Sequence, residues 1–130
     1  MLNTRQSGQT VQQLSIPSIL IKIESLALLI AAVGLYIHQS GNGWALVALI
    51  LVPDVSALGY LKSVAFGSVL YNSVHTYLLP ALLLTLSLAL NNSLSLQIAL
   101  IWFIHIAGDR LLGFGLKYPT EFKDTHLGRI

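Results

Sequence analysis

Four long apolar stretches constrain the fold of this chain more than any other feature. They cover about residues 17–37, 44–61, 64–90 and 94–112. Each is close to the roughly 20 residues that a helix needs to cross the ~30 Å hydrocarbon core of a bilayer. Their apolar residues run continuously and do not alternate, which argues against a transmembrane β-barrel. The sequence therefore predicts an all-α protein with four transmembrane helices.

The composition agrees with a lipid environment. Of the 130 residues, 55% are hydrophobic and only 9% are charged, whereas soluble domains average roughly 25% charged residues. Membrane lipids are therefore the expected surroundings. The net charge of +2 provides no basic face to neutralise a run of phosphates, so we expect no nucleic-acid partner. Cysteine is absent, which excludes disulfides and thiolate metal sites.

The connections between the apolar stretches are short, and they predict an up-down bundle. Short loops force neighbouring helices to be antiparallel. Three polar connections join the stretches: residues 39–43, 62–63 and 91–93. We expect residues 1–16 to be a disordered lead-in and residues 17–116 to form one transmembrane domain. Residues 117–130 are expected to be a tail at the cytoplasmic interface of the membrane.

Lysine and arginine near the ends of the stretches predict the orientation. Cytoplasmic loops of membrane proteins carry an excess of these residues. They are missing from residues 39–43 and 91–93. The opposite side carries five of them: Lys22, Lys62, Lys117, Lys123 and Arg129. We therefore expect a multi-pass protein of the cell (inner) membrane with both termini in the cytoplasm.

A few polar residues interrupt the apolar stretches. A charged group deep in a bilayer costs several kcal/mol, so such residues mark a functional site by default. The set consists of Glu24, Asp54, Asn72, His75, His105, Asp109 and Arg110. Counted by helical rise, these residues fall in the cytoplasmic half of the bundle. Helical spacing also places Tyr71 and Asn72 on the face of His75, as supporting polar groups.

Two histidines and two aspartates in this set suggest a metal site. Imidazole and carboxylate ligands suit zinc, iron or manganese, and helical bundles build metal sites from facing helices. The candidate ligands are Asp54, His75, His105 and Asp109. A bound metal would polarise a carbonyl or phosphoryl group and supply hydroxide near neutral pH. Near a headgroup layer, this chemistry predicts a metal-dependent hydrolase acting on a lipid-like substrate.

On the hydrolase hypothesis two further residues take part in catalysis. Glu24 is the candidate base, and Arg110 is a candidate clamp for a phosphate group. The same residues fit two other interpretations, which the sequence leaves open. One is a structural network in a non-enzymatic module, such as a homo-oligomer, with Asp109 paired to Arg110 or Lys62. The other is a proton-coupled carrier of small solutes.

The tail offers two arrangements of its polar residues. Asp124 and His126 either lie with the tail at the membrane interface or fold back over the polar cluster as a lid or extra ligands. We favour the interfacial arrangement, because the tail mixes apolar side chains with charged ones in the manner of an interfacial segment.

Several motifs resemble a known family. They are PDVSALGY at residues 53–60, YNSVHTYLLP at 71–80, HIAGDRLLGFGLK at 105–117 and FKDTHLG at 122–128. Over about residues 19–129 the chain resembles the bacterial domain-of-unknown-function 4260 family. That resemblance implies a small polytopic membrane protein and specifies no reaction.

A looser resemblance concerns the order of motifs only. Membrane-bound metal-dependent hydrolases of the YdjM type look similar in having Pro-Asp, then a His-containing motif, then a His followed by an Asp on the next helix. Pro53-Asp54, His75-Thr76 and the His105/Asp109 pair stand in that order here. Ser56 stands where that pattern has a second Asp, and the middle motif lacks its Arg. The resemblance implies the same metal ligands that the residue types indicate.

Overall fold

A computed structural model describes residues 15–129, and its regular elements are all helices. In chain order they are α1 (Ile16–His38), α2 (Gly43–Leu49), the 3-10 helix η1 (Val52–Leu61), α3 (Val64–His75), α4 (Leu78–Ala89), α5 (Ser93–Leu112) and the short 3-10 helix η2 (Leu127–Arg129). Four segments are long and apolar enough to cross a membrane: Ile16–His38, Gly43–Leu61, Val64–Ala89 and Ser93–Leu112. The predicted four-helix transmembrane fold is thus confirmed. Most of the lead-in expected at residues 1–16 lies outside the described residues.

Polar side chains at the short connections start the helices. The carboxamide of Asn42 accepts the N–H of Trp44 at 2.8 Å, at the start of α2. Ser63 and Asn92 cap α3 and α5 in the same way. Ser and Asn are preferred at this position because their oxygens accept N–H groups that have no partner within the helix. The polar turns therefore both end one span and begin the next.

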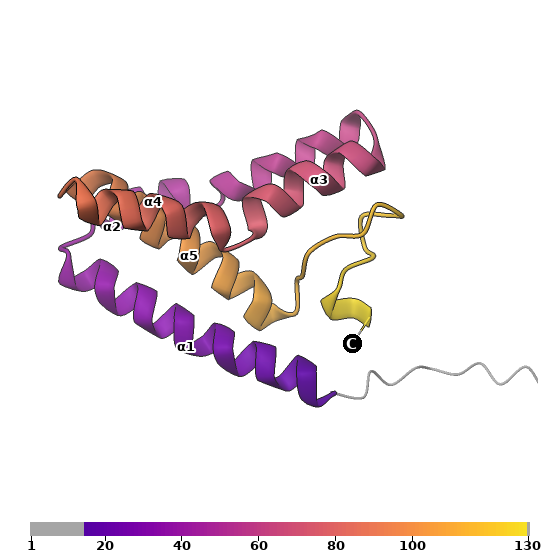
Figure 1. Cartoon of the computed structure of the whole chain (residues 1–130), viewed down its shortest axis with the longest axis horizontal. Coiled ribbons are helices and arrows are strands. Elements are labelled where there is room, and N and C mark those ends of the chain that lie inside the picture. The colour runs from indigo at the N-terminus through magenta and orange to yellow at the C-terminus, as the bar shows by residue number, and fades with distance from the viewer. Residues whose placement is uncertain (1–14, 130) are drawn as a thin grey trace, which may run out of the picture.

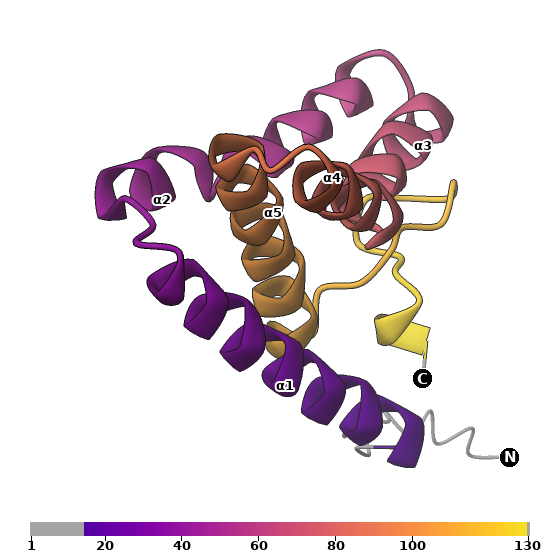
Figure 2. The same cartoon turned by 60° about the vertical axis from the view of Figure 1, so that its left-hand side comes forward.

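Helix α5 is the centre of the bundle. It packs against α1 and α4, which lie on different sides of it (Figures 1 and 2), and it is the most buried of the four spans. The apolar core joins Ala32 and Tyr36 of α1 to α5 residues Leu96, Leu100, Ile101 and Ile104. The small side chains of Ala99 and Ala107 are fully buried, which lets neighbouring helices approach α5 closely.

The second span is not a regular α-helix, as the proline within it predicts. Helix α2 ends at Leu49, and the 3-10 helix η1 follows from Val52. Pro53 has no N–H to donate, and the N–H of Asp54 donates to the carbonyl of Leu51 at 3.1 Å. The carbonyl of Ile50 is therefore left free to accept a side-chain donor.

The third span differs from its sequence prediction. The sequence predicts one helix over residues 64–90, but α3 ends at His75 and α4 begins only at Leu78, with the two helices running in different directions (Figure 1). Thr76 between them is extended, with ψ of 156°. Pro80 explains the break, because its ring lacks an N–H and would clash with the carbonyl four residues earlier. The last carbonyls of α3 are left for side-chain donors.

The C-terminal segment, residues 113–129, folds back onto α3. Helix α5 ends at Gly113, whose φ of 94° is a left-handed conformation that suits glycine. The side chain of Asn72 donates to the Lys117 carbonyl and accepts the Lys117 N–H, both at 2.7 Å. The Lys117 side chain is buried, and Lys117 forms an antiparallel bridge with Thr125. A single carboxamide on α3 thus pairs fully with the backbone of one tail residue.

Replacing Asn72 by Ala should release the C-terminal segment. Two partly buried hydrogen bonds are lost, which costs about 1–3 kcal/mol, and trypsin cleavage after Lys117 should become roughly fivefold faster or more, because it follows the open population. Ser73→Ala is the matched control, since the Ser73 hydroxyl is exposed and donates only to Val69 of its own helix. Equal cleavage of the two variants would argue against this docking.

Candidate metal centre

Four side chains from three elements bring their ligand atoms together. Asp54 of η1, His75 of α3, and His105 and Asp109 of α5 each offer one ligand atom, and these atoms all lie within 4.8 Å of one another. The two Nε2 atoms are 3.2 Å apart. Each Nε2 lies 3.1–3.6 Å from a carboxylate oxygen of both aspartates. These are the four ligands that the sequence indicates.

The tautomer of His75 is set by its own helix. Its Nδ1 lies 2.9 Å from the carbonyl oxygen of Tyr71, one turn earlier in α3. A carbonyl only accepts, so Nδ1 carries the proton and donates it. In the neutral ring Nε2 is then an unprotonated acceptor that points at the group. The ring is also stacked on Tyr71, with centroids 3.7 Å apart and planes 9° apart.

His105 is oriented in the same way by another element. Its Nδ1 lies 2.5 Å from the carbonyl oxygen of Ile50, the carbonyl that the break near Pro53 leaves free. Nδ1 again carries the proton, and Nε2 again points at the group as an acceptor. Metal-bound histidines nearly always donate their other ring N–H to such a partner. Both histidines therefore have the second hydrogen bond that a metal site requires.

With both imidazole rings neutral, the four atoms that meet in the group are all acceptors. Within residues 15–129, no lysine or arginine forms an ion pair with Asp54 or Asp109. The pairing of Asp109 with Arg110 or Lys62, which the structural interpretation invokes, does not form. A divalent cation would satisfy all four atoms. Tetrahedral bonds of about 2.0–2.2 Å place ligand atoms about 3.3–3.6 Å apart, and each Nε2 lies at a similar 3.1–3.6 Å from the carboxylate oxygens.

The four side chains differ in exposure, and the difference gives the site an open side. Both histidine side chains are 4% exposed, Asp109 is 22% exposed and Asp54 is 48% exposed. The two histidines form the buried side of the group. The carboxylate of Asp54 lies on the open side.

Comparison with known families agrees with the motifs. The family model described as domain of unknown function (DUF4260) matches residues 18–130. The chain belongs to this family. The match covers the four spans, the C-terminal segment and all four residues of the group. No curated protein and no solved structure matches the chain.

In this DUF4260 member, Arg110 supports His75. Its guanidinium is buried and donates through Nη2 to the His75 carbonyl at 3.1 Å. That carbonyl is one of those left without a helical partner at the end of α3. Its Nη1 lies 3.1 Å from Nε2 of His126. These contacts indicate that Arg110 positions His75, and its role as a phosphate clamp stays a prediction.

The two polar tail residues lie in different places. His126 contacts Arg110, and its Nδ1 accepts the Leu116 N–H at 2.7 Å. Burial, and then the charge of Arg110, lower the pKa of His126. Asp124 instead accepts hydrogen bonds from Arg129 and Thr120, and these lower its pKa to about 2. His126 thus contacts the arginine that holds His75, and Asp124 bonds only within the tail.

Lys117 is a third supporting group. Its Nζ donates to the Phe122 carbonyl at 2.8 Å and lies 4.7 Å from the centre of the Tyr71 ring. Burial lowers the pKa of this amine. The cation therefore sits against the ring that stacks on His75, and it links the tail to the candidate metal ligands.

Glu24 is not brought into the group. It is exposed on α1, whose buried face is formed by Ser18, Ser25, Ala32 and Tyr36. Helical rise gives Glu24 a depth similar to that of the ligands, but its direction depends on which face of α1 packs against α5. Its role as a base stays a prediction without a contact to support it.

Sequence reasoning missed the second hydrogen-bond shell. The Ile50 carbonyl holds His105, and Trp102 donates through Nε1 to the Val74 carbonyl at 2.7 Å. Both acceptors are backbone atoms beside helix breaks. Pro53 and Pro80 are the sequence signals that could have located them, because each proline frees nearby carbonyls.

Proposed function

We propose that this DUF4260 protein is a metal-dependent hydrolase that acts on a lipid-like substrate in the membrane. One observation carries the proposal. The Nε2 atoms of two imidazoles, each held by a carbonyl at its Nδ1, and oxygens of two carboxylates lie within 4.8 Å of one another. Zinc, manganese and iron accept such ligands. Carboxylates this close to two buried imidazole nitrogens would be stabilised by a shared cation.

The proposed reaction adds water across an ester or phosphoester bond. A divalent ion held by the four residues would need a fifth position for water or the substrate oxygen, where it would polarise the scissile carbonyl or phosphoryl group or make the water more acidic. Asp54 would hold the ion through one carboxylate oxygen and accept the proton of the attacking water through the other, which is the role that the sequence predicts for Glu24. The C–O or P–O bond breaks to give an acid and an alcohol, and no redox partner is needed.

The depth of the site supports a lipid as the substrate. The lysines and arginines predict that both chain termini lie in the cytoplasm, which we retain as part of the proposal. The metal centre then lies in the cytoplasmic half of the bilayer, below the headgroups of that leaflet. The ester and phosphoester bonds of a lipid lie near this depth.

Hydrolysis of vesicle lipids tests the proposal. The purified protein is reconstituted into vesicles of phosphatidylglycerol and phosphatidic acid with added zinc or manganese, and released fatty acid and inorganic phosphate are measured. We expect metal-dependent release that falls at least roughly 100-fold in Asp54→Asn. His38→Ala is the control, because His38 is an exposed histidine at the far end of α1. Metal binding without release of either product would contradict the hydrolase.

A further inference from the structure

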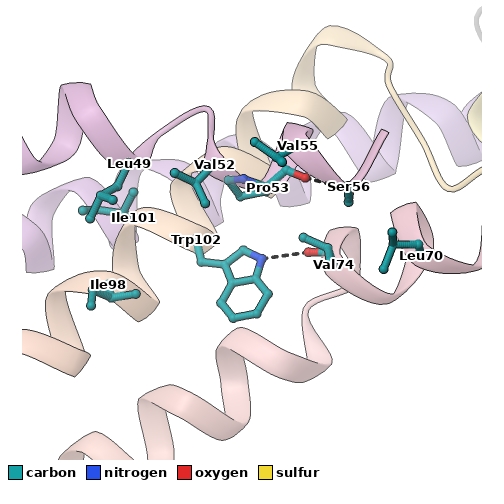
Figure 3. A pocket seen from close by; sticks show the side chains of 10 residues that line it. All are labelled: Leu49, Val52, Pro53, Val55, Ser56, Leu70, Val74, Ile98, Ile101 and Trp102. Atoms are coloured by element: carbon teal, nitrogen blue, oxygen red, sulfur yellow. Dashed lines mark hydrogen bonds between the residues drawn. The ribbon is translucent and has the colours of Figure 1, made fainter. Parts of the chain in front are cut away.

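An apolar groove runs beside the metal centre. It has a volume of about 560 Å³ and lies between the second span, α3 and α5. Figure 3 shows Val52, Val74 and Trp102 around its middle and Leu49, Ile98 and Ile101 toward one end. The volume lies within the roughly 300–1,000 Å³ range of small-molecule sites. The proposed reaction does not by itself account for this groove.

The groove offers no free hydrogen-bonding group from its lining side chains. Ser56 and Trp102 are the two lining residues with a polar side-chain atom. The Ser56 hydroxyl donates to the Pro53 carbonyl at 2.7 Å, and the Trp102 N–H donates to the Val74 carbonyl at 2.7 Å. Both donors are used within the protein. A polar occupant would lose its own hydrogen bonds there, so the groove suits a hydrocarbon.

Several lining residues of the groove are close to the candidate ligands along the chain. Pro53 precedes Asp54, and Val74 precedes His75. Trp102 lies one turn before His105 on α5. Ile98 lies two turns before His105, about 10 Å away by helical rise. The groove therefore lies beside the metal centre, and none of the four candidate ligands is among its lining residues.

We propose that the groove binds one acyl chain of a lipid, with the bond at the headgroup end of that chain placed at the metal centre. The placement of that bond for hydrolysis rests on the proposed function, whereas the binding of the acyl chain does not. It assigns the substrate to the class of lipids that carry a linear acyl chain. The chain enters from the surrounding bilayer, because the lining is apolar and the spans on either side face lipid.

Trp102 reports on the groove directly. The chain has two tryptophans, and Trp44 is 82% exposed on α2, so Trp44→Phe leaves Trp102 as the one reporter. The probe is a lysophospholipid with bromine atoms in the middle of its acyl chain, added to protein in unbrominated detergent. We expect saturable quenching of Trp102 fluorescence. Val52→Phe, which fills the groove, should weaken the binding by roughly tenfold.

Val69→Phe is the matched control, because Val69 is an exposed valine of α3 outside the groove, and it should bind like the parent. Quenching that never saturates and is equal in both variants would overturn the proposal, since Trp102 would then only face the detergent. Absence of quenching together with a dimer in size-exclusion chromatography would also overturn it, because a second copy would cover the groove.

The same titration in the His105→Ala, Asp109→Ala variant separates this proposal from the hydrolase. Acyl-chain binding should persist there, because neither residue lines the groove. Binding without metal or hydrolysis would uphold the groove and reject the hydrolase. Metal-dependent hydrolysis without saturable quenching would uphold the hydrolase and reject the groove as an acyl-chain site.

Discussion

Replacing both His105 and Asp109 by Ala should empty the metal centre while the bundle stays folded. The parent protein, purified in mild detergent without chelator, should carry close to one divalent ion per chain. The double variant loses both ligands that α5 supplies and keeps only His75 and Asp54. Loss of a supporting partner alone costs 10–100-fold in metal affinity, so loss of two ligands should cost well over about 100-fold. Elemental analysis of the two proteins measures the difference.

The control for this prediction is a histidine outside the group. His38→Ala should retain the parent metal content, because His38 is exposed and remote from the group. Size-exclusion chromatography and circular dichroism should show that the double variant is folded. A parent protein that binds neither zinc, manganese nor iron, even when they are added, would reject the metal centre. The four side chains would then form the structural network or the proton-handling site that the sequence leaves open.

Replacing Gly67 by Ala should destabilise the protein and weaken metal binding together. A Cβ at Gly67 would lie 2.7 Å from the Cα of Tyr60, and 2.5 Å from its Cγ. The backbones of α3 and η1 touch at this point, so one helix must move. Overpacking of this kind costs about 1–3 kcal/mol. Because α3 carries His75 and η1 carries Asp54, the movement should also separate two ligands.

Thermal melting in detergent, with and without added zinc, measures both effects. Gly34→Ala on α1 is the matched control, since a Cβ there meets nothing within 4 Å and alanine favours a helix over glycine. The melting temperature should fall in Gly67→Ala and hold or rise in Gly34→Ala. The rise in melting temperature on adding zinc should be smaller in Gly67→Ala. Identical behaviour of the two variants would show that α3 and η1 do not approach as closely as described.

The metal centre shows how far residue types carry the prediction. Asp54, His75, His105 and Asp109 can be selected from the sequence, because ionisable residues are rare in apolar spans and depth follows from helical rise. Glu24 meets the same criteria, yet it is exposed on α1. Depth along a helix is a property of one segment. The direction in which a side chain points around the helix axis is set by packing against a neighbouring helix. The sequence alone does not reveal that packing.

The helix breaks show the same limit of prediction from sequence. Pro53 predicts the change from α2 to η1, but the sequence alone does not reveal that the freed Ile50 carbonyl meets His105. Pro80 divides the third span, which the apolar pattern predicts as one helix. Arg110 then donates to the His75 carbonyl at the break. These contacts join residues 35 or more positions apart in the chain, and each depends on the angle at which a broken helix meets α5.

The sequence by itself determined the four spans, their up-down order and the four candidate ligands, because hydropathy, loop length and residue type are local properties of the chain. Only the tertiary structure decided that the four ligand atoms converge, that two backbone carbonyls fix the histidine tautomers, and that an apolar groove adjoins the centre. These features arise between elements, where packing sets the distances and the rotation of each helix.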